Sequence, residues 1–305
     1  ARVGFLSNAW ALVEAGEFGL VDLLAILEEF RGDRAREVVE LVVEVLSRID
    51  DSVIAEEARA SFDRWVASLL GPIHEELGWE AKPGEPESHR LLREVVLDAL
   101  ARHEPDRKLK AEAARRAKAY LREPASVPVD IAGVALRVAA RTGGIAYEPV
   151  RAALGTRSEP EHRVRILRAL GSFGDAEPIT RALDLVLSGE VRATDLRYVA
   201  RGAARGASSR RALIDWLEAH FAELAKELGP GSAAELLSVV ERGCSAEERG
   251  RAAATFRPLL QRAGSPTRRL DEALEGAAAC TELRRREEGS ATRWLGARAG
   301  ERRER

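Results

Sequence analysis

Apolar residues recur every three or four positions along nearly all of this chain, and the alternation typical of a β-strand is missing. That spacing places apolar side chains on one face of an α-helix. The longest such face comprises Phe62, Trp65, Val66, Leu69, Leu70, Ile73 and Leu77. Between Val38 and Leu46 apolar residues occupy more than one face, which predicts a helix packed between neighbours. The sequence therefore predicts an all-α protein.

Helix starts and stops follow one another at short intervals. Three pairs have the spacing of a capping box: Ser158 with Glu161, Ser232 with Glu235, and Ser245 with Glu248. From about Glu159 onward the intervals suit helix pairs of ~30–45 residues. We therefore predict a HEAT-like α-solenoid, in which antiparallel helix pairs stack into a curved superhelical bowl. A single domain is expected over residues 1–288. The last helix should break at Gly289, and the polar, Arg-rich tail of residues 289–305 should fray.

Composition excludes several classes of protein. Of the 305 residues 45% are hydrophobic and 32% charged, and the net charge is −2, which is typical of a soluble globular chain. Basic and acidic residues are nearly equal in number, which gives no reason to expect nucleic acid as a partner. No stretch of the sequence approaches the ~20 apolar residues that a membrane-spanning helix needs. Two cysteines, Cys244 and Cys280, cannot form a disulfide framework. We expect them to be reduced, buried side chains of a cytoplasmic protein.

The first residue is alanine and the chain contains no methionine, so we expect a processed or excised piece of a longer protein. Abundant Ala, Gly and Arg beside few Lys suggest a GC-rich bacterial genome.

The motifs that carry catalysis are missing or incomplete. His74-Glu75-Glu76-Leu77-Gly78 resembles the zinc-protease helix motif, but Gly78 stands where the second histidine is required. The other four histidines are dispersed, and the cysteines lack a CxxC spacing. Glycine patterns that bind phosphates are also missing from the sequence. We therefore expect no catalytic, metal-binding or cofactor-binding residue in this chain.

One basic stripe is the candidate binding feature. Arg197, Arg201 and Arg205 are four residues apart, which places three guanidinium groups on one helix face if the helix continues through Gly202. Guanidinium groups of this kind bind a peptide carboxylate through two hydrogen bonds. The alternative is an ordinary solvated helix face, and the sequence leaves both interpretations open.

Several segments are familiar in their order along the chain. They are Arg2-Val3-Gly4-Phe5-Leu6-Ser7-Asn8-Ala9-Trp10-Ala11-Leu12, Leu77-Gly78-Trp79, Val127-Pro128-Val129-Asp130, Arg168-Ala169-Leu170-Gly171-Ser172-Phe173-Gly174-Asp175, Cys244-Ser245-Ala246-Glu247 and Arg269-Leu270-Asp271-Glu272-Ala273-Leu274-Glu275. Together they resemble the C-terminal helical domain of the gluzincin zinc aminopeptidases, the group of aminopeptidase N, puromycin-sensitive aminopeptidase and the endoplasmic-reticulum aminopeptidases. The chain departs from the family at Thr194-Asp195, where a Gln-Asp pair is usual.

The resemblance implies a function for the chain. In that family zinc and the catalytic residues lie in an upstream domain, with an HExxH helix and a Gly-x-Met-Glu-Asn loop that this chain lacks. The C-terminal domain closes over that active site and lines the chamber that admits peptides. The implied partners are the upstream catalytic domain of the same polypeptide and peptide substrates. The alternative is a free-standing HEAT-like scaffold that binds other proteins.

Overall fold

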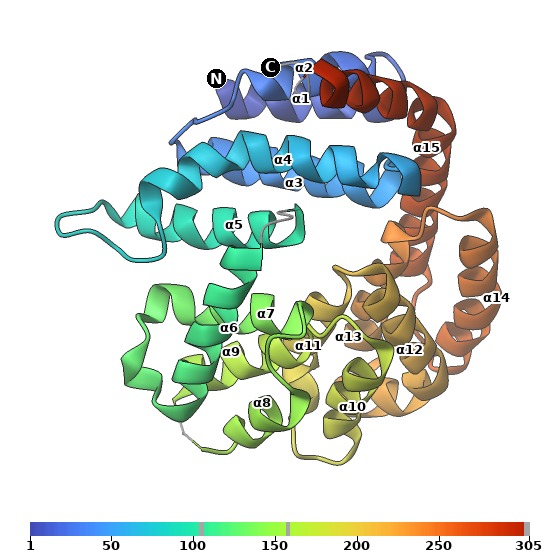
Figure 1. The fold of residues 1–305 in the computed structure, drawn as a ribbon. Coiled ribbons are helices and arrows are strands. Elements are labelled where there is room, and N and C mark those ends of the chain that lie inside the picture. Colours follow the sequence, from blue (N-terminus) through green and yellow to red (C-terminus); the bar gives the residue numbers. More distant parts are fainter. Residues whose placement is uncertain (104–106, 157–158, 302–305) are drawn as a thin grey trace. The chain divides into compact units, whose positions relative to one another are not determined.

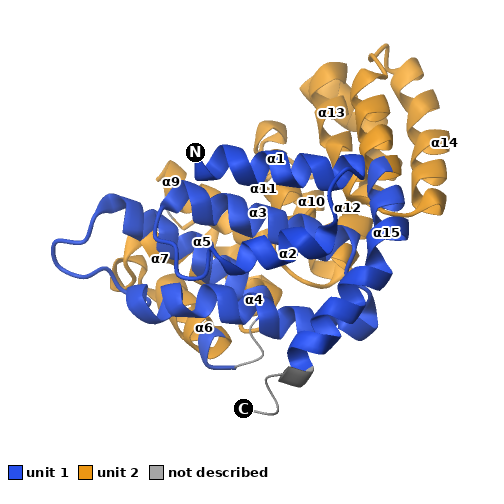
Figure 2. Ribbon diagram, turned by 90° about the horizontal axis from the view of Figure 1, so that it is seen from above, with its two compact units in different colours: residues 1–109, 279–305 blue, residues 110–278 orange. Residues whose placement is uncertain are grey.

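The helical period of the sequence is borne out in the computed structural model, which describes residues 1–103, 107–156 and 159–301 (Figure 1). Within those ranges the chain forms fifteen α-helices and three short 3-10 helices, and no strand occurs. The all-α prediction is confirmed. Contacts between residues divide the chain into two compact units (Figure 2), and each unit is described by itself. Unit 1 comprises residues 1–109 and 279–305, and unit 2 residues 110–278.

Unit 1 is built from five helices and the end of a sixth. They are α1 (Arg2–Ala15), α2 (Leu20–Glu28), α3 (Arg36–Ser52), α4 (Glu56–Leu77), α5 (Glu87–His103) and the C-terminal part of α15 (Arg268–Glu301). Helix α3 packs on α1 and on α5, so it lies between neighbours as its apolar pattern predicts. In α4 all seven residues of the predicted apolar face are buried. Burying each of these side chains contributes roughly 1.5–3 kcal/mol to the stability of the fold. Together they hold α4 on α5.

Three helix ends in unit 1 are held by arginine side chains. Arg286 donates to the carbonyl oxygen of Val13 at the end of α1 (2.6 Å), and Arg284 to that of Ser52 at the end of α3 (2.6 Å). Arg93 does the same at the end of α4. The last carbonyls of a helix have no partner within it and carry the negative end of the helix dipole. A guanidinium group satisfies both needs, so these arginines fix where the helices end.

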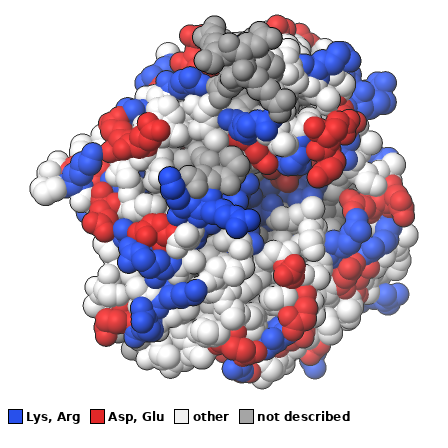
Figure 3. Space-filling model, viewed as in Figure 1, with Lys and Arg blue, Asp and Glu red and all other residues white. Residues whose placement is uncertain are grey.

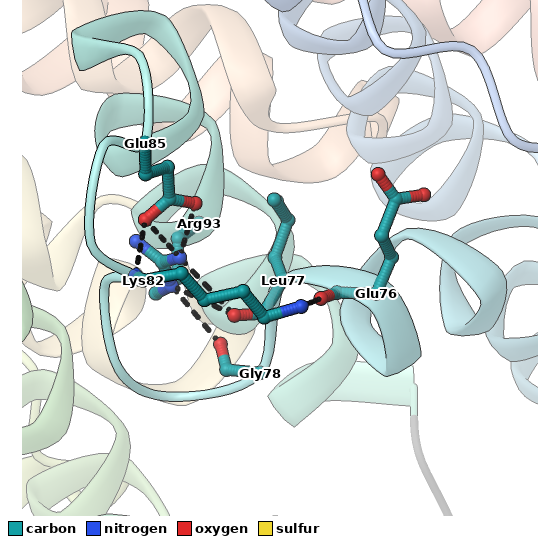
Figure 4. Close-up of polar contacts among 6 residues, drawn as sticks. All are labelled: Glu76, Leu77, Gly78, Lys82, Glu85 and Arg93. Carbon is teal, nitrogen blue, oxygen red and sulfur yellow. Dashed lines mark hydrogen bonds and ion pairs between the residues drawn. The ribbon is translucent and has the colours of Figure 1, made fainter.

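Arg93 is the most buried of the three, with 1% of its side chain exposed. Its Nη2 donates to the carbonyl oxygen of Leu77 (3.1 Å) and its Nε to that of Gly78 (3.1 Å), while the carboxylate of Glu85 closes an ion pair at 2.6 Å (Figure 4). Lys82 adds its backbone N–H to Glu85. Arg93 therefore joins the end of α4 to the loop of residues 78–86 that leads to α5.

Glu85 is ionised in this cluster. Burial raises the pKa of its carboxyl group, but hydrogen bonds from Arg93 and from the Lys82 N–H outweigh burial and leave the pKa below its usual value. A carboxyl group whose pKa is lowered by folding stabilises the fold at pH values above its unfolded pKa. That stabilisation is lost as the pH falls through the lowered value.

The C-terminal part of α15 corrects two predictions. The helix continues through Gly289 and ends at Glu301, so the predicted break is wrong, and residues 289–301 are helical where a frayed tail was expected. Ala291 and Leu295 are each 1% exposed, and the ring of Trp294 meets that of Trp65 edge-on at 5.4 Å. Buried residues continue at helical spacing past Gly289, and one glycine inside a helix costs only about 1 kcal/mol. Residues 302–305 lie outside the described part of the chain.

The cysteines also differ from the expectation. Neither is a free thiol in the structure, and both are disulfide-bonded. Cys244 is buried, as predicted, but Cys280 is only half-buried. The prediction of two reduced side chains is therefore wrong, and its reason is plain: spacing along a sequence does not show which thiols the fold brings into bonding distance.

Unit 2 contains the remaining helices. They are α6 (Arg107–Arg122), η1 (Pro124–Ser126), α7 (Val129–Arg141), α8 (Tyr147–Ala153), α9 (Pro160–Leu170), α10 (Ala176–Leu187), η2 (Ala193–Asp195), α11 (Leu196–Ala203), α12 (Ala207–Leu228), α13 (Pro230–Glu235), η3 (Leu236–Arg242) and α14 (Ala246–Arg262). Alternate helices are neighbours in the middle of this unit: α7 packs on α9 and α9 on α11, while α10 packs on α12. Two parallel rows of this kind are the packing of stacked helix pairs.

A close contact between glycines sets the distance between α9 and α11. A Cβ atom at Gly171 would overlap the carbonyl oxygen of Val199, and one at Gly202 would lie 2.6 Å from the carbonyl oxygen of Gly171. No real Cβ atom lies so close to a backbone atom. Only glycine at both positions lets the end of α9 touch the backbone of α11.

The predicted capping boxes have different outcomes. Ser245 is the N-cap of α14 and accepts a hydrogen bond from the N–H of Glu248 (3.4 Å), as predicted. Ser232 lies inside α13, whose N-cap is Gly229, so that prediction is wrong. Pro230 starts this helix three residues earlier than predicted, because its fixed φ angle suits the first helical position. Ser158 lies outside the described residues.

The surface and the helix lengths agree with the composition. On the face drawn in Figure 3, basic and acidic side chains are interspersed and form no large area of one sign. In the ranges that the structure covers, no helix combines the length and the apolar character needed to cross a membrane.

Replacing Gly202 by alanine tests the glycine contact. Gly202→Ala should lower stability by about 1–3 kcal/mol, because its methyl group collides with the backbone at Gly171. Gly250 in α14 is the matched control, since a Cβ atom there meets nothing within 4 Å. Gly250→Ala should raise stability by about 1 kcal/mol through helix propensity alone. Thermal unfolding followed by circular dichroism measures both, and equal stabilisation by the two substitutions would contradict the contact.

Replacing Arg93 by methionine tests the cap of α4. Arg93→Met leaves the Glu85 carboxylate buried without its cation, and losing one partner of a buried ion pair costs about 3–5 kcal/mol. Arg285→Met, in the same unit, removes an arginine that is 71% exposed and paired with Glu282. That control should change stability little. Urea unfolding of both variants gives the comparison, and a small loss for Arg93→Met would show that the loop is held by other contacts.

Candidate functional site

The arginine stripe lies on and just beyond α11. The helix continues through Gly202, as the stripe requires, and ends at Ala203. Arg197 and Arg201 are therefore on the helix, while Arg205 follows in the turn before α12. All three side chains are exposed. The structure brings them together on the edge of one cavity in unit 2.

This arginine-lined cavity has a volume of about 960 Å³. One wall is η2 and α11, and the facing wall is the end of α12 with α13 and η3. The charged residues that line it are Arg192, Arg197, Arg201, Arg205, Arg242, Glu227, Glu235 and Glu241. Arginines thus outnumber glutamates. A cavity of this size and sign suits an anionic ligand with an apolar part.

Asp195 fixes the start of α11. It is 5% exposed, and its Oδ2 accepts hydrogen bonds from the Nε atoms of Arg163 and Arg192, each at 3.2 Å. A carboxylate just before a helix also lies at the positive end of the helix dipole. Arg192 is therefore engaged with Asp195, a carboxylate that it shares with Arg163.

Arg197 and Arg201 have no such acidic partner. The Nη2 of Arg197 donates to the hydroxyl group of Tyr198 (2.9 Å), and its guanidinium group lies 4.8 Å from the centre of that ring. For Arg201 the described residues provide neither a hydrogen bond nor an ion pair. The two adjacent turns of α11 therefore present two cations whose charges the described residues do not neutralise.

Apolar side chains form the inner surface of the cavity. Leu196 and Leu213 are each 1% exposed, and Val239 is 5% exposed. Guanidinium groups above an apolar surface can hold a carboxylate and a neighbouring apolar side chain at once. None of the described residues that line the cavity is a histidine or a cysteine.

A second cavity in unit 2 differs in its charges. It has a volume of about 460 Å³ and lies between α12 and α14. Arg211 pairs with Glu248 at 2.6 Å, and Arg251 pairs with Asp215 and with Glu218. The hydrogen bonds that Arg251 donates to Glu218 and then to Asp215 raise its pKa. These cations are neutralised by carboxylates, so this cavity is a weaker candidate for binding an anion.

Two histidines, His162 and His103, make contacts that hold neighbouring helices together. His162 is 4% exposed, its Nδ1 lies 2.8 Å from the hydroxyl group of Tyr120, and its Nε2 lies 3.0 Å from the carbonyl oxygen of Ala153. A neutral ring that accepts from the tyrosine and donates to the carbonyl satisfies both contacts. His103 contacts Asp63 at 2.9 Å.

The incomplete zinc motif ends a helix. The backbone N–H of Gly78 bonds to the carbonyl oxygen of His74, and Glu76 pairs with Arg34. Over the described ranges no group of three or more His, Cys, Asp or Glu could hold a metal ion. The side chains present therefore do not fit a zinc ion.

Sequence reasoning identified one wall of the cavity and missed the other. The wall opposite α11 includes Glu227, Glu235 and Arg242, which follow this helix by more than twenty positions in the sequence. Their only sequence signal is Gly229-Pro230-Gly231, which ends α12 and turns the chain back. Nothing in their spacing shows which earlier helix they oppose.

Comparison with known proteins gives the family. The sequence profile of a family described as "ERAP1-like C-terminal domain" matches residues 1–279. Aminopeptidase M1-A of Oryza sativa subsp. japonica is 28% identical over 225 residues, which are 71% of this chain and 25% of that protein. Alanine/arginine aminopeptidase of Saccharomyces cerevisiae is 27% identical over 236 residues, 76% of this chain and 27% of that protein.

A further relative is aminopeptidase M1 of Arabidopsis thaliana, 27% identical over 242 residues, which are 75% of this chain and 27% of that protein. The chain thus spans about a quarter of the length of the curated relatives that it matches. These relatives come from plants and yeast and give no support to a bacterial origin.

Arg197 and Arg201, which have no acidic partner among the described residues, predict a preference for a carboxylate ligand. A short peptide with an apolar last residue and a free C-terminus should bind more tightly than the same peptide with a C-terminal amide. Arg201→Gln should weaken binding of the free acid about tenfold, since a hydrogen bond to a charged group contributes about 1.5–3 kcal/mol. It should leave the amide unchanged. Arg251→Gln, in the second cavity, is the control and should leave both unchanged. Fluorescence anisotropy measures the affinities, and equal binding of acid and amide would favour the solvated-face interpretation.

Proposed function

The chain belongs to the family of ERAP1-like C-terminal domains, and we propose that it is the non-catalytic C-terminal domain of a zinc metallo-aminopeptidase. The observation that carries the proposal is the family match over residues 1–279. Its relatives are named aminopeptidases and are about four times as long as the part that this chain matches. That leaves room in such a protein for a separate catalytic domain. The match also supports this function over that of a free-standing scaffold.

The proposed role is to close over the active site of the upstream domain and to line the chamber that admits peptides. Stacked helix pairs form extended walls, because small rotations between successive pairs add up. Closure of such a wall excludes water from the chemistry. Arg197, Arg201 and Arg205 are the proposed peptide-contacting residues, with the arginine-lined cavity as the place where a peptide carboxylate binds.

Zinc would be held outside this chain. The donor set of the described residues does not fit a metal ion, so the proposal assigns zinc and all catalytic groups to the upstream domain. The partners are that domain and peptide substrates, with no role for nucleic acid or a membrane. We also propose that the single domain predicted for residues 1–288 includes α15 to its end at Glu301. The expected cytoplasmic location rested on reduced cysteines, and the disulfide-bonded cysteines remove that support, since disulfides are rare in reducing compartments.

The test compares three samples: the chain alone, the full polypeptide, and the full polypeptide without this domain. The chain alone should hydrolyse no alanyl-anilide and should contain no stoichiometric zinc. The full polypeptide should cleave peptides with a preference for length that changes when this domain is removed, because the chamber wall is gone. Rates on peptides of increasing length and zinc content by elemental analysis give the result. One tightly bound zinc with turnover by the chain alone, or an unchanged length profile, would contradict the proposal.

A further inference from the structure

Arginines from three neighbouring helices follow one another across unit 2. Helices α7, α9 and α11 lie side by side, since α7 packs on α9 and α9 on α11 (Figure 1). On each helix these arginines lie opposite the residues that pack in the core, and none of their side chains is buried. The set, called the arginine row below, comprises Arg137 on α7, Arg165 and Arg168 on α9, and Arg197 and Arg201 on α11.

The row crosses from α7 to α9 at Gly133. A Cβ atom at this glycine would lie 3.4 Å from Nη1 of Arg137 and 3.8 Å from Cγ of Arg165. The two arginines therefore reach the same glycine, one from each helix. Arg165 and Arg168 are three positions apart, so they share one face of α9. The row thus continues from α7 onto α9 without interruption.

Tyr198 joins the row where α9 meets α11. The guanidinium carbon of Arg168 lies 5.8 Å from the centre of the Tyr198 ring, and that of Arg197 lies 4.8 Å from it. A cation over an aromatic ring at such a distance is attracted to it. One tyrosine therefore holds guanidinium groups from two helices. The ring carries no net charge, so it positions these cations without neutralising them.

Acidic partners for the row are missing where the structure describes the chain. Arg165, Arg168 and Arg197 form no ion pair there, and Nε of Arg168 is buried without a hydrogen-bond partner. Glu161 on α9 and Asp130 on α7 lie on the same faces as the row, yet neither forms an ion pair with a described residue. Bringing like charges together costs folding free energy. An anionic ligand supplies the charges that the fold leaves out.

We propose that the arginine row binds acidic side chains of an extended peptide whose terminal carboxylate lies at Arg197 and Arg201. Packed helices are about 8–10 Å apart, and an extended peptide advances about 3.3 Å per residue. Each step from one helix to the next therefore spans about two or three residues of the peptide. Acidic residues that far before the last residue meet Arg165 and Arg168, and acidic residues further back meet Arg137. The inference rests on the proposed function for the position of the terminal carboxylate.

The row suits an acidic peptide better than a nucleic acid. Single-stranded nucleic acids bind where their bases stack on aromatic rings. Tyr198 is the aromatic residue of this face, and guanidinium groups already lie over its ring. A carboxylate needs no stacking surface, because a guanidinium group binds it through two parallel hydrogen bonds.

A matched pair of peptides tests the proposal on the unaltered chain. Both carry a fluorophore at the N-terminus and end in leucine with a free carboxylate, and they differ in having Asp or Asn at the second and third positions before that leucine. The Asp peptide should bind about tenfold more tightly at low salt, because hydrogen bonds to a charged acceptor are the stronger ones. High salt should shrink that advantage through screening. Fluorescence anisotropy measures the affinities. Equal affinities would overturn the proposal, and so would tighter binding of a single-stranded oligonucleotide than of the Asp peptide.

Two variants assign the preference to the row. The double variant Arg165→Gln with Arg168→Gln should lose the preference for Asp over Asn and keep the preference for a free terminal carboxylate over an amide. Its melting temperature should not fall, because the substitutions remove charges that repel one another. Arg151→Gln is the matched control, since Arg151 lies on α8 in the same unit and pairs with Glu190 at 2.6 Å. That control should keep both preferences, and a double variant that still prefers Asp would overturn the proposal.

Failure of this inference differs from failure of the proposed function. If the unaltered chain prefers the free acid to the amide but binds the Asp and Asn peptides equally, the arginine row is wrong and the terminal-carboxylate site stands. If it binds the acid and the amide equally, the terminal-carboxylate site is wrong, and with it the position that this inference takes from it.

Discussion

Contact between two glycine backbones determines where the candidate site lies. Gly171, just after α9, and Gly202, in α11, approach so closely that neither position has room for a side-chain carbon. That contact places α11 against the end of α9, and α11 carries Arg197 and Arg201. The two arginines lie at the edge of the cavity because α11, which carries them, packs closely against the end of α9. A contact between two uncharged glycines thus determines where the charged side chains of the site lie.

Unit 1 depends on a different interaction, the guanidinium group placed at a helix end. Arg93, Arg284 and Arg286 each donate to the final carbonyl oxygens of a helix. Arginine suits this task because its donors are several, lie in one plane and remain charged when buried. The same residue type therefore serves two purposes in this chain: it ends helices in unit 1, and it lines a cavity in unit 2.

How much could be predicted from the sequence depended on whether the information was local. The apolar face of α4 and the N-cap at Ser245 were correct, because period and capping involve residues within one or two turns. The helix start near Ser232 was misplaced, since Pro230 competes for the same turn. The break at Gly289 was wrong because Trp294 packs on Trp65, a residue more than two hundred positions away.

The candidate site shows the same division. The stripe on α11 was visible as a spacing of four, and the structure places all three arginines around one cavity. The facing wall from α12 to η3 was not predictable, since its place opposite α11 is a result of tertiary packing. Its electrostatic character was equally hidden, because only the structure shows that Arg192 pairs with Asp195 while Arg197 and Arg201 have no acidic partner among the described residues.

The long helix α15 has a practical consequence for anyone producing this domain. The family match ends at residue 279, in the middle of that helix. A protein trimmed there would be missing Arg284, Arg286 and Trp294, and with them the caps on α1 and α3 and the ring against Trp65. The final carbonyl oxygens of α1 and α3 would lose their hydrogen-bond donors, and the ring of Trp65 would be exposed to solvent. Boundaries for recombinant expression should therefore extend to residue 301.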